Sequence, residues 1–528
     1  MKVMEALHVY DTTLRDGAQQ EGLNLSVSDK IAIAELLDDL GVDYIEGGWP
    51  GANPKDTEFF ERARTELHLR HATLVAFGST RKAGSSAAED AQVRALVDAG
   101  ASVVTIVAKS HVRHVEQALR TTLEENLAMV RDTVTHLTGH GLRVFLDAEH
   151  FFDGWHLDRE YALSVVRAAH ESGAEVVVLC DTNGGMLPHQ MEAVVADVIE
   201  QTGARVGAHC HNDTGCAVAN TIAAVRAGAS HVQGTVNGYG ERTGNADLIT
   251  VAANLQLKLG LDAIAPEGLR QAMHIAHAIS EVTNVPAYSR QPYVGASAFA
   301  HKAGLHASAL KIDPDLYQHL DPALVGNGMR TLVSDMAGRA SIELKAQEAG
   351  LDVSAHPELV AKVLAEVKAL ELRGWTFDAA DASIELLIRQ AMEPGCADYF
   401  DVESWRVITE GSDETAASEA TVKLHADGGR HVATGEGNGP VNALDHALRQ
   451  ALSRAYPEID KLELIDFKVR ILDASHGTDA VTRVLIETSD GETSWNTIGV
   501  AGSIIQASWR ALVDGIVYGL IRHEVPIR

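Results

Sequence analysis

The stretch RVGAHCHN, residues 205–212, ends an apolar run with two histidines one residue apart. It is one of eight short runs of the same kind in the first half of the chain. They are LHVYDTTL (7–14), VDYIEGGW (42–49), ATLVAFGS (72–79), SVVTIVAK (102–109), RVFLDAEH (143–150), EVVVLCDT (175–182), RVGAHCHN (205–212) and HVQGTVNG (231–238). Short runs rich in β-branched and other apolar residues predict buried β-strands.

Between these runs lie amphipathic stretches with apolar residues at helical spacing and a glycine where the helix should end. DKIAIAELLDDLG (29–41) and PHQMEAVVADVIEQTG (188–203) are examples. Strand and helix therefore alternate about eight times, which predicts a (β/α)8 TIM barrel. A doubly wound open sheet is the alternative, but no glycine-rich dinucleotide turn follows the first run.

The rest of the chain predicts two further parts. We assign residues 1–270 to a catalytic barrel and residues 271–395 to a linker and helical subdomain, because the second stretch contains long helical patterns. From residue 396 strand patterns return, so residues 396–528 are assigned to an α+β domain.

An internal repeat marks this last domain. Residues 431–452 and 493–516 share glycine, alanine and leucine at the same spacing, which indicates a duplicated unit of strands followed by a helix. The first copy contains GEGNG, residues 435–439. This run is a weak candidate for a phosphate loop, and because no lysine–serine pair follows it, a turn is the better interpretation.

The net charge restricts the partners. A formal charge of −29 argues against nucleic acid or an anionic membrane surface as a ligand. An anionic substrate would need a local cation, such as a metal ion or an arginine in a cleft. The four cysteines form no CxxC pair, which favours reduced thiols in a cytoplasmic protein. We find no leader-like N-terminus and expect no apolar run of membrane-spanning length.

Polar residues follow several of the predicted strands. The C-terminal ends of the strands of a TIM barrel meet at one mouth, where active sites lie. The candidates there are Arg15, Asp16, Glu46, Glu149, Asp181, Thr182, His209, His211, Asn237, Glu241 and Asn245. Residues two apart on a strand point the same way, so His209 and His211 should project together. With Asp16 they offer two imidazoles and a carboxylate, which suits a divalent cation that keeps positions open for substrate.

Structural roles are the alternatives for these residues. The two histidines could be hydrogen-bonded core residues, and Asp11 could cap a turn. Glu46 and Glu241 could be solvated loop acids, and Arg15 could pair with one of the acids. We favour a metal site because the histidines, Arg15 and Asp16 all fall at the predicted mouth.

Three long motifs carry a resemblance to a known family. DTTLRDGAQQEG (11–22), HCHNDTGCAVANT (209–221) and VNGYGERTGNADL (236–248) resemble the signatures of the acyltransferase family that includes 2-isopropylmalate, homocitrate and citramalate synthases. The resemblance covers nearly the whole chain. EGGWPGANPKDTEFF (46–60) and DAEHFFDGW (147–155) are most similar to the citramalate synthase branch.

The resemblance implies the condensation of acetyl-CoA with a 2-keto acid, with hydrolysis of the thioester, in a metal-dependent reaction. Asp16, His209, His211 and Asn245 match the metal site of the family, with Mg²⁺ or Mn²⁺, or else Zn²⁺, as the ion. Arg15 matches the catalytic arginine, which also binds the keto acid. For the citramalate branch the keto acid would be pyruvate, in isoleucine biosynthesis.

The same resemblance suggests roles for four more residues. Thr182 would bind the carboxylate of the keto acid, and Glu149 would position the acetyl group. In SAFAHKAGLHASALKIDPDLYQHLDP (297–322), His306 matches the catalytic base and Tyr317 its partner. Ala307 and Ser308 stand where an acidic residue often follows this histidine. His301 and Lys302 are further candidates, with a structural role as the alternative for His301.

The family also implies a regulatory C-terminal domain and a homodimer in which the helical region of one chain lies over the barrel of the other. Isoleucine would be the inhibitor of a citramalate synthase, and leucine that of an isopropylmalate synthase. Two other functions stay open at this point. 2-Isopropylmalate or homocitrate synthase would share every residue above, since a methyl group or two in the substrate pocket cannot be read from sequence. A non-catalytic amino-acid sensor should have lost some of these residues, and all are present.

Overall fold

The computed structural model describes residues 6–411, 416–472 and 480–528. The chain forms two compact units. The first runs to Phe299 and also contains Asp321–Gly328, and the second contains Ala300–Leu320 and Met329–Arg528. Each unit is described by itself below.

The first unit is a closed barrel of parallel strands, as the sequence predicts. The strands are β1 (His8–Asp11), β2 (Tyr44–Gly48), β3 (Thr73–Ser79), β4 (Val103–Lys109), β5 (Arg143–Glu149), β6 (Val176–Asp181), β7 (Val206–Cys210) and β8 (His231–Gly234). The last strand pairs with the first, from His8 opposite His231 to Asp11 opposite Gly234. This pairing closes the sheet, so the open doubly wound alternative is wrong.

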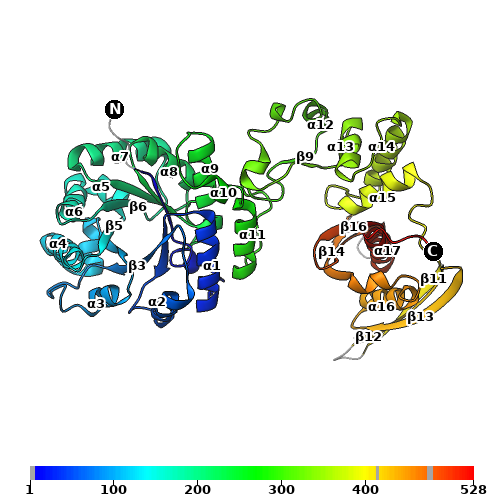
Figure 1. The fold of residues 1–528 in the computed structure, drawn as a ribbon, viewed down its shortest axis with the longest axis horizontal. Coiled ribbons are helices and arrows are strands. Elements are labelled where there is room, and N and C mark those ends of the chain that lie inside the picture. The colour runs from blue at the N-terminus through cyan, green and yellow to red at the C-terminus, as the bar shows by residue number, and fades with distance from the viewer. Residues whose placement is uncertain (1–5, 412–415, 473–479) are drawn as a thin grey trace. The chain divides into compact units, whose positions relative to one another are not determined.

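Helices surround the strands (Figure 1). They are α1 (Val27–Leu40), α2 (Pro54–Glu66), α3 (Ala91–Asp98), α4 (Leu123–Gly139), α5 (Phe151–Leu157), α6 (Arg159–Glu171), α7 (Pro188–Thr202), α8 (Ala217–Arg226), α9 (Leu248–Leu257), α10 (Pro266–Leu269) and α11 (Ala272–Thr283). The short 3-10 helices η1 (Gly17–Gln19) and η3 (Val236–Gly238) follow β1 and β8, and a π-helix, η2 (His114–Leu119), follows β4. The ends of α1 show the local cause of such boundaries: Ser26 and Asp29 form a capping box, and Gly41 ends the helix with φ 88°.

The barrel is packed rather than hollow. Buried side chains from six of its strands form one cluster: Tyr10, Tyr44, Val75, Val103, Phe145, Val176, Val178 and Cys180. The aromatic rings of Tyr44 and Phe145 meet edge to face with centroids 5.2 Å apart. This packing holds the strand ends, and so the loops that follow them, in fixed positions.

The second unit begins with helices and two short strands that pair with each other. They are β9 (Ala300–His301), α12 (Gly304–Leu310), η4 (Pro314–Leu316), β10 (Arg330–Thr331), α13 (Arg339–Glu348), α14 (Pro357–Leu372) and α15 (Asp381–Met392), while η5 (Pro322–Val325) belongs to the first unit. Ala307 of α12 packs against Ala340 and Leu344 of α13. The helical region expected before residue 395 is therefore present.

Two antiparallel sheets, each followed by a helix, complete the second unit. The first copy is β11 (Asp401–Gly411), β12 (Ala416–Ala426), β13 (Gly429–Gly437) and α16 (Pro440–Leu452), followed by η6 (Pro457–Lys461). The second copy is β14 (Glu463–Ile471), β15 (Thr482–Ser489), β16 (Ser494–Ala501) and α17 (Ile504–Arg522). The duplicated unit predicted from the sequence is thus confirmed.

Equivalent glycines allow each helix to lie close against its sheet. A Cβ atom on Gly435 of β13 would come within 2.4 Å of the backbone nitrogen of Ala447 in α16. A Cβ atom on Gly499 of β16 would come within 1.9 Å of the carbonyl oxygen of Ala507 in α17. The repeat in the sequence therefore reflects a repeated close approach of helix and strand.

One core joins the helical pieces to the second sheet. Val360 of α14 and Ile384 of α15 lie in the same buried cluster as Ile498 and Val500 of β16. The Ser383 hydroxyl also accepts a hydrogen bond of 3.1 Å from the backbone N–H of Ile498. Residues on the two sides of the boundary predicted after residue 395 therefore share one core. The domain boundaries after residues 270 and 395 stay predictions.

Helix α17 is long and apolar enough to cross a membrane by length and composition. The expectation that no apolar run reaches this length is therefore wrong. The reason for its apolar character is burial: Ala507, Leu512, Ile516 and Leu520 belong to the core between the helices and the sheets. A core helix of this kind needs apolar side chains around much of its circumference.

Candidate metal and substrate site

Three buried side chains converge at the mouth of the barrel. Asp16 follows β1, His209 lies on β7, and His211 lies two residues further on. The Nε2 atoms of the two histidines are 3.2 Å apart, and His209 Nε2 is 3.4 Å from Asp16 Oδ2. One ligand atom from each residue lies within 4.8 Å of the others. The structure thus brings together the residues that the sequence predicts as ligands.

This donor set fits a metal ion. Two imidazole nitrogens that face each other beside a carboxylate place three lone-pair donors around one point. Asn245 adds a fourth group, since its Nδ2 donates to Asp16 Oδ1 at 3.3 Å while its Oδ1 is buried with no hydrogen-bond partner among the described residues. His211 Nδ1 also lacks one there. A cation held by these groups would satisfy the buried Asn245 oxygen that is otherwise unpaired.

The charge states of Asp16 and His211 suit the same purpose, while at His209 burial opposes protonation but Asp16 raises the pKa of the imidazole, so metal binding there displaces a proton. Burial opposes ionisation of Asp16, but Arg15 and His209 hold the pKa of its carboxyl group below the ordinary value. Burial, together with the neighbouring His209, lowers the pKa of His211 to about 4. A charged carboxylate and a neutral imidazole are the forms that bind metals.

Arg15 lies beside this cluster and is held by two acids. Its Nε donates to Glu46 Oε2 at 2.5 Å, and its Nη1 donates to Asp16 Oδ2 at 3.1 Å. The guanidinium carbon lies 3.9 Å from the centre of the Phe77 ring. Burial disfavours the charged guanidinium, but Glu46 and Asp16 raise its pKa above the ordinary value. Arg15 is therefore a fixed positive charge next to the candidate metal position.

Glu46 is not a solvated acid. It is wholly buried, and its second oxygen accepts a hydrogen bond of 2.6 Å from the Tyr10 hydroxyl. Glu241 is exposed, as the solvated alternative expects. Asp11 caps a turn, because it accepts hydrogen bonds of 2.8 Å from both the backbone N–H and the hydroxyl of Thr13. The structural alternative therefore holds for Asp11 and Glu241 and fails for Glu46.

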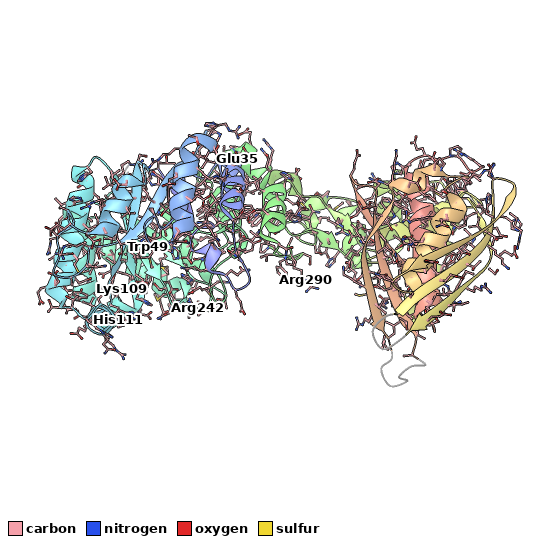
Figure 2. All side chains as sticks on the ribbon, turned by 90° about the horizontal axis from the view of Figure 1, so that it is seen from below. Glu35, Trp49, Lys109, His111, Arg242 and Arg290 are labelled. Atoms are coloured by element: carbon pink, nitrogen blue, oxygen red, sulfur yellow. The ribbon has the colours of Figure 1, made fainter. Side chains whose placement is uncertain are left out.

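Thr182 and Glu149 lie at neighbouring strand ends. The Thr182 hydroxyl oxygen accepts a hydrogen bond of 2.9 Å from the backbone N–H of His150, and its carbonyl oxygen accepts one of 2.8 Å from Arg242 Nη2. The hydroxyl proton of Thr182 is left to donate. Glu149 forms an ion pair with Lys109 at the end of β4. Figure 2 labels Lys109 and Arg242, which lie on the same side of the barrel in that view.

A cavity of about 770 Å³ opens beside the cluster in the first unit. Its walls include Asn212, Tyr239 and Asn245, together with the glycine-containing turn between them. A substrate larger than a keto acid would therefore find room next to the candidate metal position.

His306 and Tyr317 belong to the second unit. Their rings stack with centroids 4.1 Å apart and an angle of 28° between the planes. His301 is farther away, with its ring centre 6.2 Å from that of His306. Lys302 forms an ion pair with Asp378 at 2.9 Å. His306 and Tyr317, which the sequence predicts to be partners, are thus in direct contact.

The sequence analysis missed two buried residues behind the histidines. His209 Nδ1 lies 2.8 Å from Gln233 Oε1, and Gln233 Nε2 lies 3.1 Å from Asp147 Oδ1. The pairing of Gln233 in register with His209 on the neighbouring strand β7 appears only in the structure.

Comparison with protein families divides the chain into three matched regions. Residues 6–277 match the HMGL-like family, and residues 293–374 match the homocitrate synthase post-HMGL domain-like family. Residues 378–520 match the LeuA allosteric (dimerisation) domain. The matches follow the order of barrel, helical region and duplicated sheets.

Relatives of nearly the same length decide the family. The chain is 65% identical to an (R)-citramalate synthase of Streptomyces coelicolor, over 99% of this chain and 98% of the relative. It is 49% identical to an (R)-citramalate synthase of Aquifex aeolicus, over 98% and 99%. The chain belongs to the (R)-citramalate synthase family. A third member of the (R)-citramalate synthase family, from Synechocystis, is 47% identical over 98% of this chain. The resemblance seen in the sequence is therefore confirmed.

Proposed function

We propose that the chain is an acyltransferase that condenses acetyl-CoA with pyruvate and hydrolyses the thioester with one water molecule, releasing citramalate and CoA. The observation that carries this proposal is the 65% identity to an (R)-citramalate synthase along nearly the whole of both chains. The buried cluster of Asp16, His209 and His211 supports it, because a keto acid offers two oxygens to a metal.

We assign the metal to Asp16, His209, His211 and Asn245, and expect Mg²⁺ or Mn²⁺, with Zn²⁺ as the alternative. When bound, the ion acts as a Lewis acid on the keto oxygen of pyruvate. Imidazole nitrogens suit Zn²⁺, whereas carboxylate and amide oxygens suit Mg²⁺ and Mn²⁺, so this mixed donor set does not decide among the three ions. Metal analysis of the purified protein and activity with each added ion would decide it.

Three residues of the barrel would handle the substrates. Arg15 is positioned to stabilise the negative charge that develops on the keto oxygen as the new carbon–carbon bond forms. Thr182 would donate its free hydroxyl proton to the pyruvate carboxylate. Glu149 would position the acetyl group, with Lys109 fixing its carboxylate. All three residues lie at or shortly after the C-terminal ends of strands in the first unit.

His306 is proposed as the base that removes a proton from the acetyl methyl group. Its match to the family motif and its stacking on Tyr317 support this role, since the stacked ring restricts the orientation of the imidazole. His306→Gln should stop exchange of the acetyl methyl hydrogens with deuterium from the solvent. If His306→Gln forms no product but still exchanges the acetyl methyl hydrogens, His306 is not the base that removes the proton.

A panel of keto acids tests the reaction. Pyruvate, 2-ketoisovalerate and 2-oxoglutarate are each offered with acetyl-CoA and Mg²⁺ or Mn²⁺, and free CoA is measured with a thiol reagent. We expect pyruvate to give the highest kcat/KM by a wide margin. A preference for 2-ketoisovalerate would make the chain a 2-isopropylmalate synthase, and a preference for 2-oxoglutarate a homocitrate synthase.

The C-terminal match supports regulation and assembly. We propose that isoleucine inhibits the enzyme, that the protein is a homodimer, and that it acts in the cytoplasm in isoleucine biosynthesis. Calorimetry and rate measurements on the full chain with isoleucine, leucine and valine test the first point, with an expected coupling of about 1–3 kcal/mol. An absence of binding and of any rate effect for all three would make the duplicated sheets purely structural. Light scattering of the purified protein tests the dimer.

A further inference from the structure

His209 also has a hydrogen-bond partner on the side of its ring that faces away from the other candidate metal ligands. Its Nδ1 lies 2.8 Å from the Oε1 atom of Gln233, and both side chains are buried. Gln233 lies on β8 directly beside His209 on β7. The imidazole is therefore contacted at both nitrogens, by Asp16 and His211 at Nε2 and by Gln233 at Nδ1.

The orientation of the Gln233 amide follows from its other neighbours. Its Nε2 lies 3.1 Å from Asp147 Oδ1 and 3.4 Å from His231 Nε2. The structure has Gln233 Nε2 donating to Asp147 Oδ1, so the NH₂ group of Gln233 faces Asp147. Reversing the amide would set its oxygen against that carboxylate and its NH₂ group against His209. The oxygen of Gln233 consequently faces His209 Nδ1.

This arrangement determines which nitrogen of His209 carries the proton. An amide oxygen is an acceptor, so Nδ1 must be the donor. A neutral imidazole has one proton, and with that proton on Nδ1 the lone pair on Nε2 points toward Asp16 and His211. The reverse tautomer would bury a nitrogen lone pair against the oxygen of Gln233.

We propose that Gln233 is a positioning residue that holds His209 in the Nδ1–H tautomer, with Nε2 free to bind the metal, and that Asp147 holds Gln233 in turn. The inference rests on the metal site proposed above and extends it to the residues behind the ligands. Gln233 contacts no substrate and acts only through His209. Loss of such a partner of a histidine ligand typically weakens metal binding 10–100-fold.

The test compares three variants of the full-length protein after removal of metal by dialysis against a chelator. Gln233→Leu keeps the size of the side chain and removes the acceptor. Gln233→Glu keeps an acceptor for Nδ1–H, and its second oxygen shares one proton with Asp147, because two neighbouring buried carboxyl groups do not both ionise. Gln291→Leu is the matched control, because Gln291 is a buried glutamine of the same unit whose amide contacts Asn237 and Asp247. Affinity for Zn²⁺ and Mn²⁺ is measured by competition with a metal-binding dye.

We expect Gln233→Leu to weaken metal binding about 10–100-fold, with Gln233→Glu and Gln291→Leu within a few-fold of the unmodified protein. Unchanged affinity in Gln233→Leu, or equal losses in Gln233→Leu and Gln233→Glu, would overturn the proposal. If the unmodified protein binds neither Zn²⁺ nor Mn²⁺, the proposed metal site itself is wrong.

A second measurement reads the unmodified protein and uses a substitution only to assign the signal. Nitrogen-15 NMR of histidine-labelled, Zn²⁺-loaded protein reports the proton on each ring nitrogen, and His209→Gln identifies the signal. We expect His209 to carry its proton on Nδ1 and to bind the ion through Nε2. Coordination through Nδ1 would overturn the role of Gln233.

Discussion

Arg15 and Glu46 form a 2.5 Å ion pair at the mouth of the barrel, and Glu46 is wholly buried. The two oxygens of Glu46 accept from two different donors, Arg15 and the Tyr10 hydroxyl. Tyr10 lies on β1 and Glu46 on β2, so the ion pair links Arg15 to the packed interior of the barrel. The position of the candidate catalytic arginine is therefore fixed by the core.

Glu46→Gln should destabilise the first unit and reduce activity. A glutamine is neutral, so the buried guanidinium of Arg15 loses its carboxylate partner even when the amide NH₂ group donates to the Tyr10 hydroxyl. A hydrogen bond to a charged group contributes about 1.5–3 kcal/mol. Thermal unfolding measures the effect, with Glu241→Gln as the exposed control. Equal unfolding temperatures for the two variants would contradict this account of Glu46.

Arg15→Lys should bind the keto acid but lose most of its turnover. The guanidinium donates to Glu46 and Asp16 from two different nitrogens, and a single ammonium group cannot reproduce that planar geometry. The loss should appear mainly in kcat, because charge stabilisation matters most in the transition state. Steady-state kinetics measure it, with Arg62→Lys on the surface of α2 as control. A raised KM with unchanged kcat would assign Arg15 to substrate binding alone.

His209→Ala and His211→Ala should each abolish activity and lose bound metal while the barrel stays folded. The two side chains lie at the strand ends, outside the cluster that fills the barrel. Elemental analysis gives the metal content, and circular dichroism checks the fold. His170→Ala, an exposed histidine on α6, serves as control. Full metal content in the double variant would rule out this site.

Gly499→Ala and Gly435→Ala should each destabilise the second unit. The new Cβ atom would lie 1.9 Å from the carbonyl oxygen of Ala507 in the first case, so α17 would have to shift. Overpacking of this kind costs about 1–3 kcal/mol. Gly502→Ala is the control, since a Cβ atom there meets nothing within 4 Å. Unfolding transitions that coincide in the three variants would show that the close approach is not tight.

The barrel could be predicted from the sequence because its signals are local. Each strand is a short apolar run, and each helix shows its own periodicity and caps, as α1 does between Ser26 and Gly41. The candidate ligands were predictable for a related reason, since residues that follow parallel strands meet at one mouth.

The remaining parts of the site depend on contacts between distant residues. The burial of Glu46 follows from its contacts with Arg15 and Tyr10, which no local pattern reveals. Gln233 and Asp147 are separated by 86 positions and appear as ordinary polar residues within strands. The apolar composition of α17 was likewise underestimated, because its burial depends on packing against sheets formed by other segments.

The core shared by α14, α15 and β16 limits how this protein can be recombined with its relatives. Ile498 and Val500 pack with the helical segment, and α12, which carries His306, packs in turn on α13. A chimera joined after residue 395 would combine two halves of one core from different parents and leave mismatched surfaces. A join at Met329 would still separate α12 from α13. Exchange of effector response between relatives should therefore succeed only when the donor segment begins near Ala300 and Asp321–Gly328, which belongs to the first unit, is kept from the recipient. The candidate base is then inherited together with the regulatory sheets.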